Sequence, residues 1–256
     1  MLVTCALATA VPVLGQTPPQ PTPQPAGSIP RTADGKPDFN GIWQVLNTAA
    51  FDIQDHHARE GVPAGQGIVV GNEIPYQEWA LAKKKENGAN RASVDPEAKC
   101  FMLGVPRAMY TDLPFQIFQK RDIVTVAFEY AHGLRYIYTN GTAHPRGPID
   151  WWMGDSRGHW DGDTLVVDVV HFNEGLFDRA GNFHSDALHV VERFTPRGPD
   201  HILYEVTVED PKVFTRPWKM STVFYRRVEP NVRLLEYECY SFGVERFYPY
   251  PGVTKY

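Results

Sequence analysis

The chain has 256 residues, of which 43% are hydrophobic and 21% are charged, and its formal net charge is −5. This composition excludes a disordered chain, a coiled coil and a polytopic membrane protein, and it fits one medium-sized domain or two small ones. The chain has no basic tract and therefore lacks the clustered cations that phosphate binding needs, so nucleic acid is not an expected partner.

The N-terminal residues indicate export. Residues 2–14 form an uncharged apolar run, which is too short to span a bilayer and is typical of a secretory signal peptide. We assign residues 1–15 to this peptide, with a buried strand as the alternative, and residues 16–37 to a Pro-rich linker. The mature chain is then expected to be secreted or periplasmic, without an integral membrane span.

Two cysteines remain in the mature chain, Cys100 and Cys239. In an oxidising compartment they are predicted to form a disulfide. A catalytic thiol is the alternative, whereas a metal site needs more ligands than this pair supplies.

Residues 38–256 are predicted to form a single β-barrel domain, which opens with a strand at 41–46. Residues 48–110 then have little strand character and form an insertion with one predicted helix, 75–86. Pro75 suits the first helical position, and Asn87-Gly88 suits the cap. We expect this helix to lie across the mouth of the barrel. The insertion is either a lid over a cavity or an excursion without function.

The remaining chain reads as short strands separated by turns. Val124, Val126 and Phe128 share one face by period-two alternation, and Asn140-Gly141 is a tight-turn signal. The expected strands are 115–120, 122–130, 134–139, 164–170, 187–194, 201–209, 218–228 and 232–240. This pattern predicts a mainly β fold: an antiparallel up-and-down barrel with a partly helical insertion, or a sandwich.

The opening Gly41-Ile42-Trp43, followed by an antiparallel meander, resembles the GxW start of lipocalin-like (calycin) barrels. The resemblance implies that Trp43 closes one end of the barrel and packs near a basic residue of a late strand. The candidates for that residue are Arg216, Arg226, Arg227 and Arg233. The resemblance also implies that the barrel carries a small apolar ligand.

Several strings along the chain resemble a large family of uncharacterised secreted bacterial proteins. They are TADGKPDFNGIW (32–43), DPEAKC (95–100), GVPRAMY (104–110), WDGDTLVVD (160–168), HSDALHVVERF (184–194) and TRPW (215–218). This resemblance covers nearly the whole mature chain but implies no reaction. Where relatives have Met-Gly-His-Ser, this chain has Asp155 in place of the His. Any role of that His is then altered here or moved to His159.

Polar and aromatic side chains are densest in two predicted connections, 144–160 and 171–189. Loops at one end of a rigid barrel commonly carry sites, and a His beside a carboxylate can move protons near neutral pH. The candidate catalytic residues are His184, Asp186, His144, Asp155 and His159. The alternative for residues 184–186 is a turn that caps the next strand through side-chain hydrogen bonds.

Candidate ligand contacts combine flat aromatic faces with nearby polar groups. They are Trp151, Trp152, Tyr110, Tyr136, His189, Arg193 and Glu129. Charged strand residues such as Arg135 and Glu192 point either into the barrel, where they need partners, or into solvent. His184, Asp186 and His189 are metal-ligand types, but their spacing does not strengthen a metal site, and we expect neither a metal nor a cofactor.

These observations predict a secreted barrel whose cavity binds a small aromatic or apolar molecule. The His and Asp groups suggest cofactor-free acid–base chemistry, as in a lyase, isomerase or hydrolase. The alternatives are a non-catalytic ligand carrier and an interaction module of the cell envelope.

Overall fold

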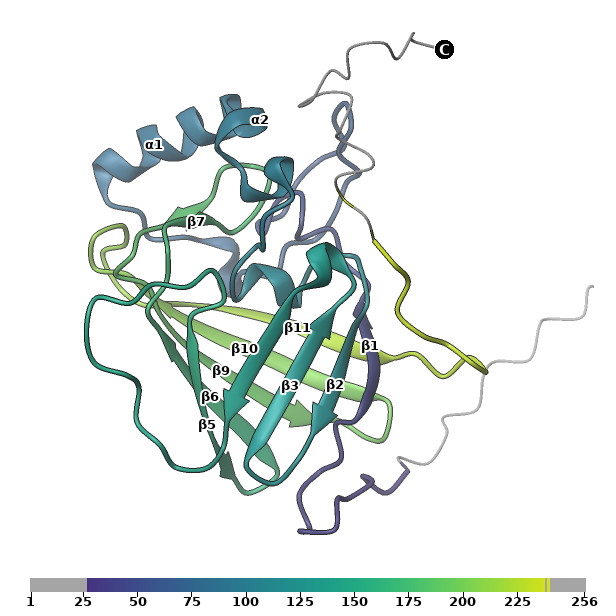
Figure 1. Ribbon diagram of the computed structural model, residues 1–256. Coiled ribbons are helices and arrows are strands. Elements are labelled where there is room, and N and C mark those ends of the chain that lie inside the picture. Colours follow the sequence, from purple (N-terminus) through teal and green to yellow (C-terminus); the bar gives the residue numbers. More distant parts are fainter. Residues whose placement is uncertain (1–26, 238, 240–256) are drawn as a thin grey trace, which may run out of the picture.

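The computed structural model describes residues 27–237 and Cys239, in which nine strands close into a mainly β barrel (Figure 1). The strand order around the barrel is β1-β11-β10-β9-β6-β5-β4-β3-β2. The strands are β1 Gly41–Val45, β2 Phe115–Gln119, β3 Ile123–Phe128, β4 Leu134–Tyr138, β5 Asp155–Asp161, β6 Thr164–Val170, β9 His189–Pro196, β10 His201–Glu209 and β11 Trp218–Arg226. The predicted barrel with a small helical insertion is therefore confirmed.

One strand pair departs from the expected antiparallel meander. β4 and β5 are parallel and pair only through Ile137 with Ser156 and Tyr138 with Arg157. Parallel neighbours need a connection that returns to the end where the first strand began. Residues 139–154 make that return, so the wall between β4 and β5 is paired over a short stretch only.

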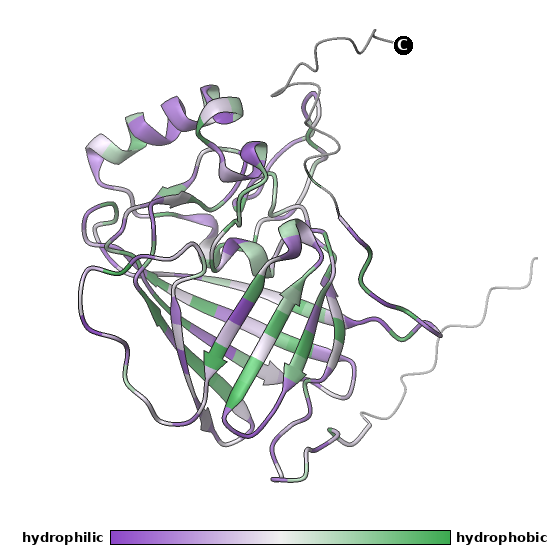
Figure 2. Cartoon of the chain, in the orientation of Figure 1, coloured by the Kyte–Doolittle hydropathy of each residue, from purple (hydrophilic) through white to green (hydrophobic). Residues whose placement is uncertain are grey.

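The interior of the barrel is packed with side chains. Successive strand residues alternate between buried and exposed, as in β3 and β10, and Figure 2 shows the same alternation as hydrophobic and hydrophilic bands. Buried residues from every side of the wall include Phe115, Val126, Ile137, Val167, Phe194, Tyr204 and Phe224. The sequence predicted a ligand cavity inside the barrel. The structure corrects this expectation, because side chains of the described residues fill the centre of the barrel.

Trp43 is buried in this core and packs against an arginine of the last barrel strand. It is 1% exposed, and its indole Nε1 donates to the carbonyl of Phe39 over 2.8 Å. The guanidinium of Arg226 lies 4.2 Å from the centre of the indole ring. Of the four arginines considered, Arg226 is thus the one that packs on Trp43, in the geometry of a cation–π contact.

The insertion lies between β1 and β2 and covers the other end of the barrel (Figure 1). Its elements are η1 Val70–Asn72, α1 Glu78–Ala89, α2 Arg91–Val94, η2 Pro96–Lys99 and η3 Arg107–Met109, and η4 Tyr130–His132 follows β3. The helix α1 begins after Gln77 and continues through Asn87-Gly88, which were expected to end it. It lies over a small hairpin formed by β7 Gly175–Leu176 and β8 Phe183–His184.

Two glycines allow helix and hairpin to approach closely. A side chain at Gly181, whose φ is +95°, would lie 2.4 Å from the Lys84 carbonyl, and one at Gly88 would lie 2.7 Å from the Ala180 carbonyl. Only glycine fits such contacts without moving the backbone. The position of α1 over the hairpin is therefore set by main-chain packing.

Three local expectations differ from the structure. Strand β5 was missed, residues 232–237 form no strand although 232–240 was predicted as one, and β9 begins at His189 instead of 187. Residues 238 and 240 of the expected last strand lie outside the described residues, as do the expected signal peptide and residues 16–26 of the linker. The end of the linker contacts the barrel, since Arg31 forms an ion pair with Asp163.

Cys100 and Cys239 form the predicted disulfide, with their Cα atoms 5.6 Å apart. It joins the insertion to the segment that follows β11. None of the helices within residues 27–237 has the length and apolar character needed to cross a membrane.

Candidate functional site

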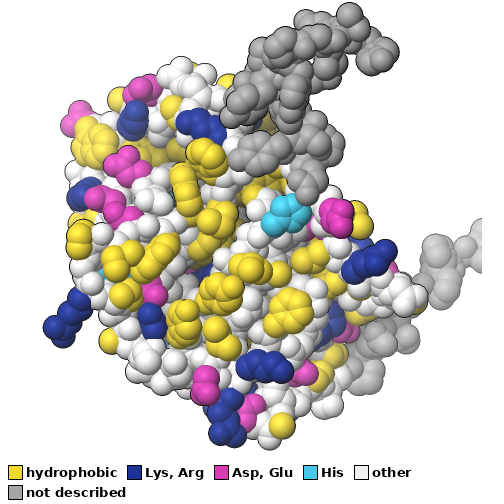
Figure 3. Space-filling view, in the orientation of Figure 1, with side chains coloured by type: hydrophobic (Ala, Val, Ile, Leu, Met, Phe, Trp, Pro, Cys, Tyr) yellow, Lys and Arg dark blue, Asp and Glu magenta, His cyan; other side chains and the backbone are white. Residues whose placement is uncertain are grey.

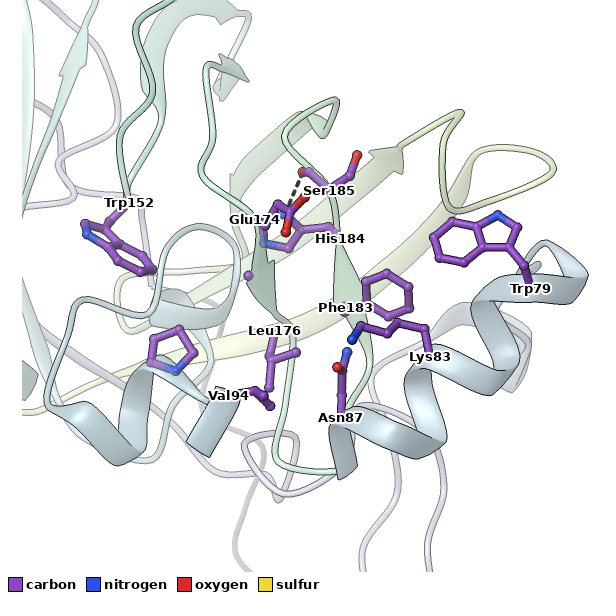
Figure 4. Close-up of a pocket in the computed structure, with 12 residues that line it drawn as sticks. Trp79, Lys83, Asn87, Val94, Trp152, Glu174, Leu176, Phe183, His184 and Ser185 are labelled. Atoms are coloured by element: carbon purple, nitrogen blue, oxygen red, sulfur yellow. Dashed lines mark hydrogen bonds between the residues drawn. The ribbon is translucent and has the colours of Figure 1, made fainter. Parts of the chain in front are cut away.

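A cleft with polar and aromatic lining lies between α1 and the β7–β8 hairpin, and we call it the helix cleft. It has a volume of about 400 Å³ and is lined by Trp79, Lys83, Asn87, Trp152, Glu174, Phe183 and His184, among others. Figure 4 shows Trp79 and Trp152 at opposite ends, with His184, Glu174 and Phe183 between them. This volume and this lining, apolar walls with a few polar groups, are those of small-molecule sites.

His184 is the central polar group of the helix cleft. The residue is 5% exposed, and burial lowers the pKa of its imidazole to about 4, so the ring is neutral near neutral pH. Its Nδ1 lies 3.0 Å from the Ser185 carbonyl, which assigns the ring proton to Nδ1. Nε2 is then a hydrogen-bond acceptor, and it makes no hydrogen bond within the described residues.

Gly175 keeps Nε2 of His184 accessible. A Cβ at position 175 would lie 2.7 Å from that nitrogen, closer than real contacts allow. Ser185, whose carbonyl accepts from the ring, is itself held in place, because its N–H and hydroxyl donate to the two oxygens of Asp210 over 2.6 and 3.0 Å. The imidazole is therefore held in one orientation with one free lone pair.

A second unsatisfied polar group lies on α1. Asn87 is 5% exposed, yet its side-chain amide makes no hydrogen bond to any described residue. Lys83 lies one turn earlier on the same face and pairs with Glu86 at 3.2 Å. A buried amide without a partner costs free energy unless water or a ligand satisfies it. Neither polar atom of the Asn87 amide is fully buried, so water or a ligand can satisfy it from the cleft.

The turn between β7 and β8 is organised by a buried carboxylate. Asp178 is fully buried and accepts hydrogen bonds from the backbone of Ile53, Ala180 and Asn182 and from the Asn182 amide. Burial raises its pKa to about 6. The Tyr76 hydroxyl, just before α1, donates to Asn182 over 2.9 Å. These hydrogen bonds connect the turn of the hairpin to the residue before α1 through Asp178 and Asn182, behind the cleft.

A second cleft, which we call the wall cleft, opens where β4 and β5 are poorly paired. Its volume is about 480 Å³, and its lining includes Tyr136, Tyr138, Trp151, Trp152 and Asp155. Figure 3 shows apolar side chains gathered on this side of the molecule, over β2 to β4. Trp152 lines both clefts. The predicted ligand contacts Trp151, Trp152 and Tyr136 are thus brought together.

The polar groups at the wall cleft already have partners. Asp155 accepts from His144 Nδ1 and from Arg157 Nε, both over 2.6 Å. Although burial opposes it, these partners hold the pKa of Asp155 below its ordinary value. His144 Nε2 lies 2.8 Å from Asp168, which also pairs with His189 at 2.8 Å. Both nitrogens of His144 are therefore occupied by carboxylates.

This His–Asp network lies on the outer face of β5, β6 and β9. His144 anchors the returning segment 139–154, which carries Trp151 and Trp152, to the barrel wall. The predicted pair His144 and Asp155 does form, but it lies on the outer wall of the barrel, and among the described residues it makes no hydrogen bond to His184. His189 points outward, where it pairs with Asp168 and Glu209.

The other predicted site residues lie apart from both clefts. Asp186 is exposed and paired with Lys212, His159 is exposed on the outer face of β5, and Arg193 pairs with Asp161. The Tyr110 side chain is buried in the core, and its hydroxyl donates to the Phe177 carbonyl over 2.8 Å. Glu129, also buried, accepts from the backbone of Leu235. Ion pairs, packing in the core or exposure to solvent account for the positions of these five side chains, without a functional role.

His184, Asp186 and His189 do not converge on a common point, and no group of three or more such ligands in residues 27–237 has the arrangement of a metal site. Sequence reasoning missed Asn87, Lys83, Glu174 and Phe183 as cleft residues. The Asn-Gly pair gave a cap signal, and nothing in the pattern indicated that the helix runs on and faces a hairpin.

Comparisons with family models, curated proteins and solved structures found no match to this chain.

Proposed function

We propose that the protein binds a small aromatic molecule that carries a hydrogen-bond donor, and that the helix cleft is the binding site. The observation that carries this proposal is the neutral, buried His184, whose free acceptor Nε2 faces a cleft with walls of Trp79, Trp152 and Phe183. Aromatic walls favour a flat ring, and an unpaired acceptor favours a ligand with an O–H or N–H group.

Binding has a stronger basis than catalysis. A general base works best when its pKa lies near the operating pH, and the pKa of His184 is about 4. His144 has no free nitrogen, since Asp155 and Asp168 occupy both. The carrier alternative therefore fits this geometry better than acid–base chemistry.

The test uses 2-naphthol, which has a hydroxyl donor, and 2-methoxynaphthalene, which has none. Both are titrated against quenching of tryptophan fluorescence. The wild type should prefer 2-naphthol by roughly 2- to 10-fold, the value of one hydrogen bond. His184→Asn places an amide N–H near Nδ1 and removes Nε2, so the preference should disappear. Equal affinity of the wild type for both probes would overturn the donor assignment.

A matched pair of variants locates the site. Trp79, 53% exposed, lines the helix cleft, whereas Trp151, 39% exposed, lines the wall cleft only. Trp79→Ala should weaken 2-naphthol about 10-fold, and Trp151→Ala should leave it unchanged. Neither variant removes a core residue. Absence of saturable binding, or a larger effect of Trp151→Ala, would refute the proposal.

We also propose that the protein is exported. A disulfide is typical of secreted and periplasmic proteins, and the apolar run at residues 2–14 precedes the Pro-rich segment. Intact-mass spectrometry of the exported protein should show a chain that lacks residues 1–15. A full-length chain in the cytoplasm would contradict the proposal.

A further inference from the structure

We infer that the ligand of the helix cleft is an aromatic carboxylic acid, bound with its carboxylate at Lys83 and Asn87 and its donor at His184. This inference rests on the proposed function and names the ligand class of the same site. It follows from the placement of charge and of unsatisfied polar groups along the cleft.

The two sides of the cleft differ in charge. On the α1 side, Lys83 and Asn87 offer an ammonium and an amide that has no partner among the described residues. On the hairpin side, Figure 4 shows the Glu174 carboxylate beside His184. An anionic group near Glu174 would be repelled, whereas a hydroxyl there can donate to Nε2 of His184. The ligand therefore has its anionic group at α1 and its donor at the hairpin.

The Lys83 ammonium is available to such an anion. Its pair with Glu86 has both side chains exposed, by 42% and 59%, and exposed pairs of this kind are weak. A ligand carboxylate can replace Glu86 and also accept from the Asn87 amide, which no other described group satisfies. Asn87 lies in the last turn of α1, where the helix dipole opposes an anion, whereas Lys83 lies near the middle of the helix. The attraction must therefore come chiefly from Lys83.

The test compares 6-hydroxy-2-naphthoate, its methyl ester and 2-naphthol by the same fluorescence titration. The acid should bind about 10-fold more tightly than the ester, as expected for a charge-assisted hydrogen bond, and the advantage should shrink with added salt. Lys83→Met should abolish the advantage. Asn87→Ala, which favours the helix, should reduce it by a smaller factor.

Lys85 provides the matched control, because it lies on the same helix, is exposed and does not line the cleft. Lys85→Met makes the same change of charge and should leave the preference for the acid intact. If 2-naphthol binds but the acid binds no better than the ester, or if Lys83→Met and Lys85→Met have equal effects, this inference is overturned while the proposed function stands. If 2-naphthol does not bind, the proposed function itself fails.

Discussion

Breaking the ion pair inside the barrel should be the most damaging single change to the fold. Arg135 and Glu192 are 1% and 0% exposed, and the guanidinium donates to both carboxylate oxygens of Glu192. The Tyr204 hydroxyl donates to the same carboxylate over 2.6 Å, and Ser156 accepts from the guanidinium. The pair thus sits in a fully bonded polar network within an apolar core.

The expected cost follows from what each change leaves behind. Glu192→Gln leaves a buried arginine without an anion, and removing one partner of such a pair typically costs about 3–5 kcal/mol. Total stabilities are about 5–15 kcal/mol, so this loss is a large fraction. Because arginine cannot lose its proton, Glu192→Gln should cost more than Arg135→Met. The double variant Arg135→Met, Glu192→Gln removes both charges together and should cost less than the sum of the two single variants.

Urea unfolding, followed by circular dichroism at pH 7, measures these changes as a double-mutant cycle. Arg193→Met is the control, because it lies next to Glu192 on the outer face and its pair with Asp161 is exposed, by 43% and 63%. That control should cost less than about 1 kcal/mol. Single-variant costs as small as the control, or costs that simply add in the double variant, would refute the reasoning.

Two further predictions concern pH and redox state. Burial opposes protonation of His189, but Asp168 and Glu209 outweigh it and raise the pKa of the imidazole. The stabilisation that protonated His189 gives the fold is fully present below the ordinary pKa of about 6.5. It is lost as the pH rises through the raised pKa. His189→Gln should therefore reduce the fall in urea midpoint from about pH 6 to about pH 9, and an unchanged fall would contradict this. The Cys100–Cys239 bond joins residues that are 139 positions apart, so it restricts the entropy of the unfolded chain. Its reduction should destabilise the fold by up to about 5 kcal/mol, measured by thermal unfolding. A change below about 1 kcal/mol would contradict this entropic explanation.

Period-two patterning was enough to predict most of the barrel wall. β3, β6 and β10 combine alternating or continuous apolar residues with clear turns, and they lie at or within two residues of the expected positions. β5 was not predictable in this way, because two of its three inward positions are Ser156 and Gly158, and only Trp160 is apolar. Ser156 is needed inside for the Arg135 guanidinium. Because β5 places a polar side chain next to a buried charge, it lacks the alternating apolar pattern from which the other strands were predicted.

The position of the candidate site has a related cause. The barrel interior is filled by Phe115, Phe194, Tyr204 and Phe224, and the cleft that we propose as the binding site lies where the insertion meets the barrel end. There the residues come from α1, from the hairpin and from the segment that carries Trp152, which are far apart in the chain. Local patterns identified His184 and Trp152, because each stands out within its own segment. They could not identify Asn87, since its significance arises only from the missing partner that three-dimensional packing reveals.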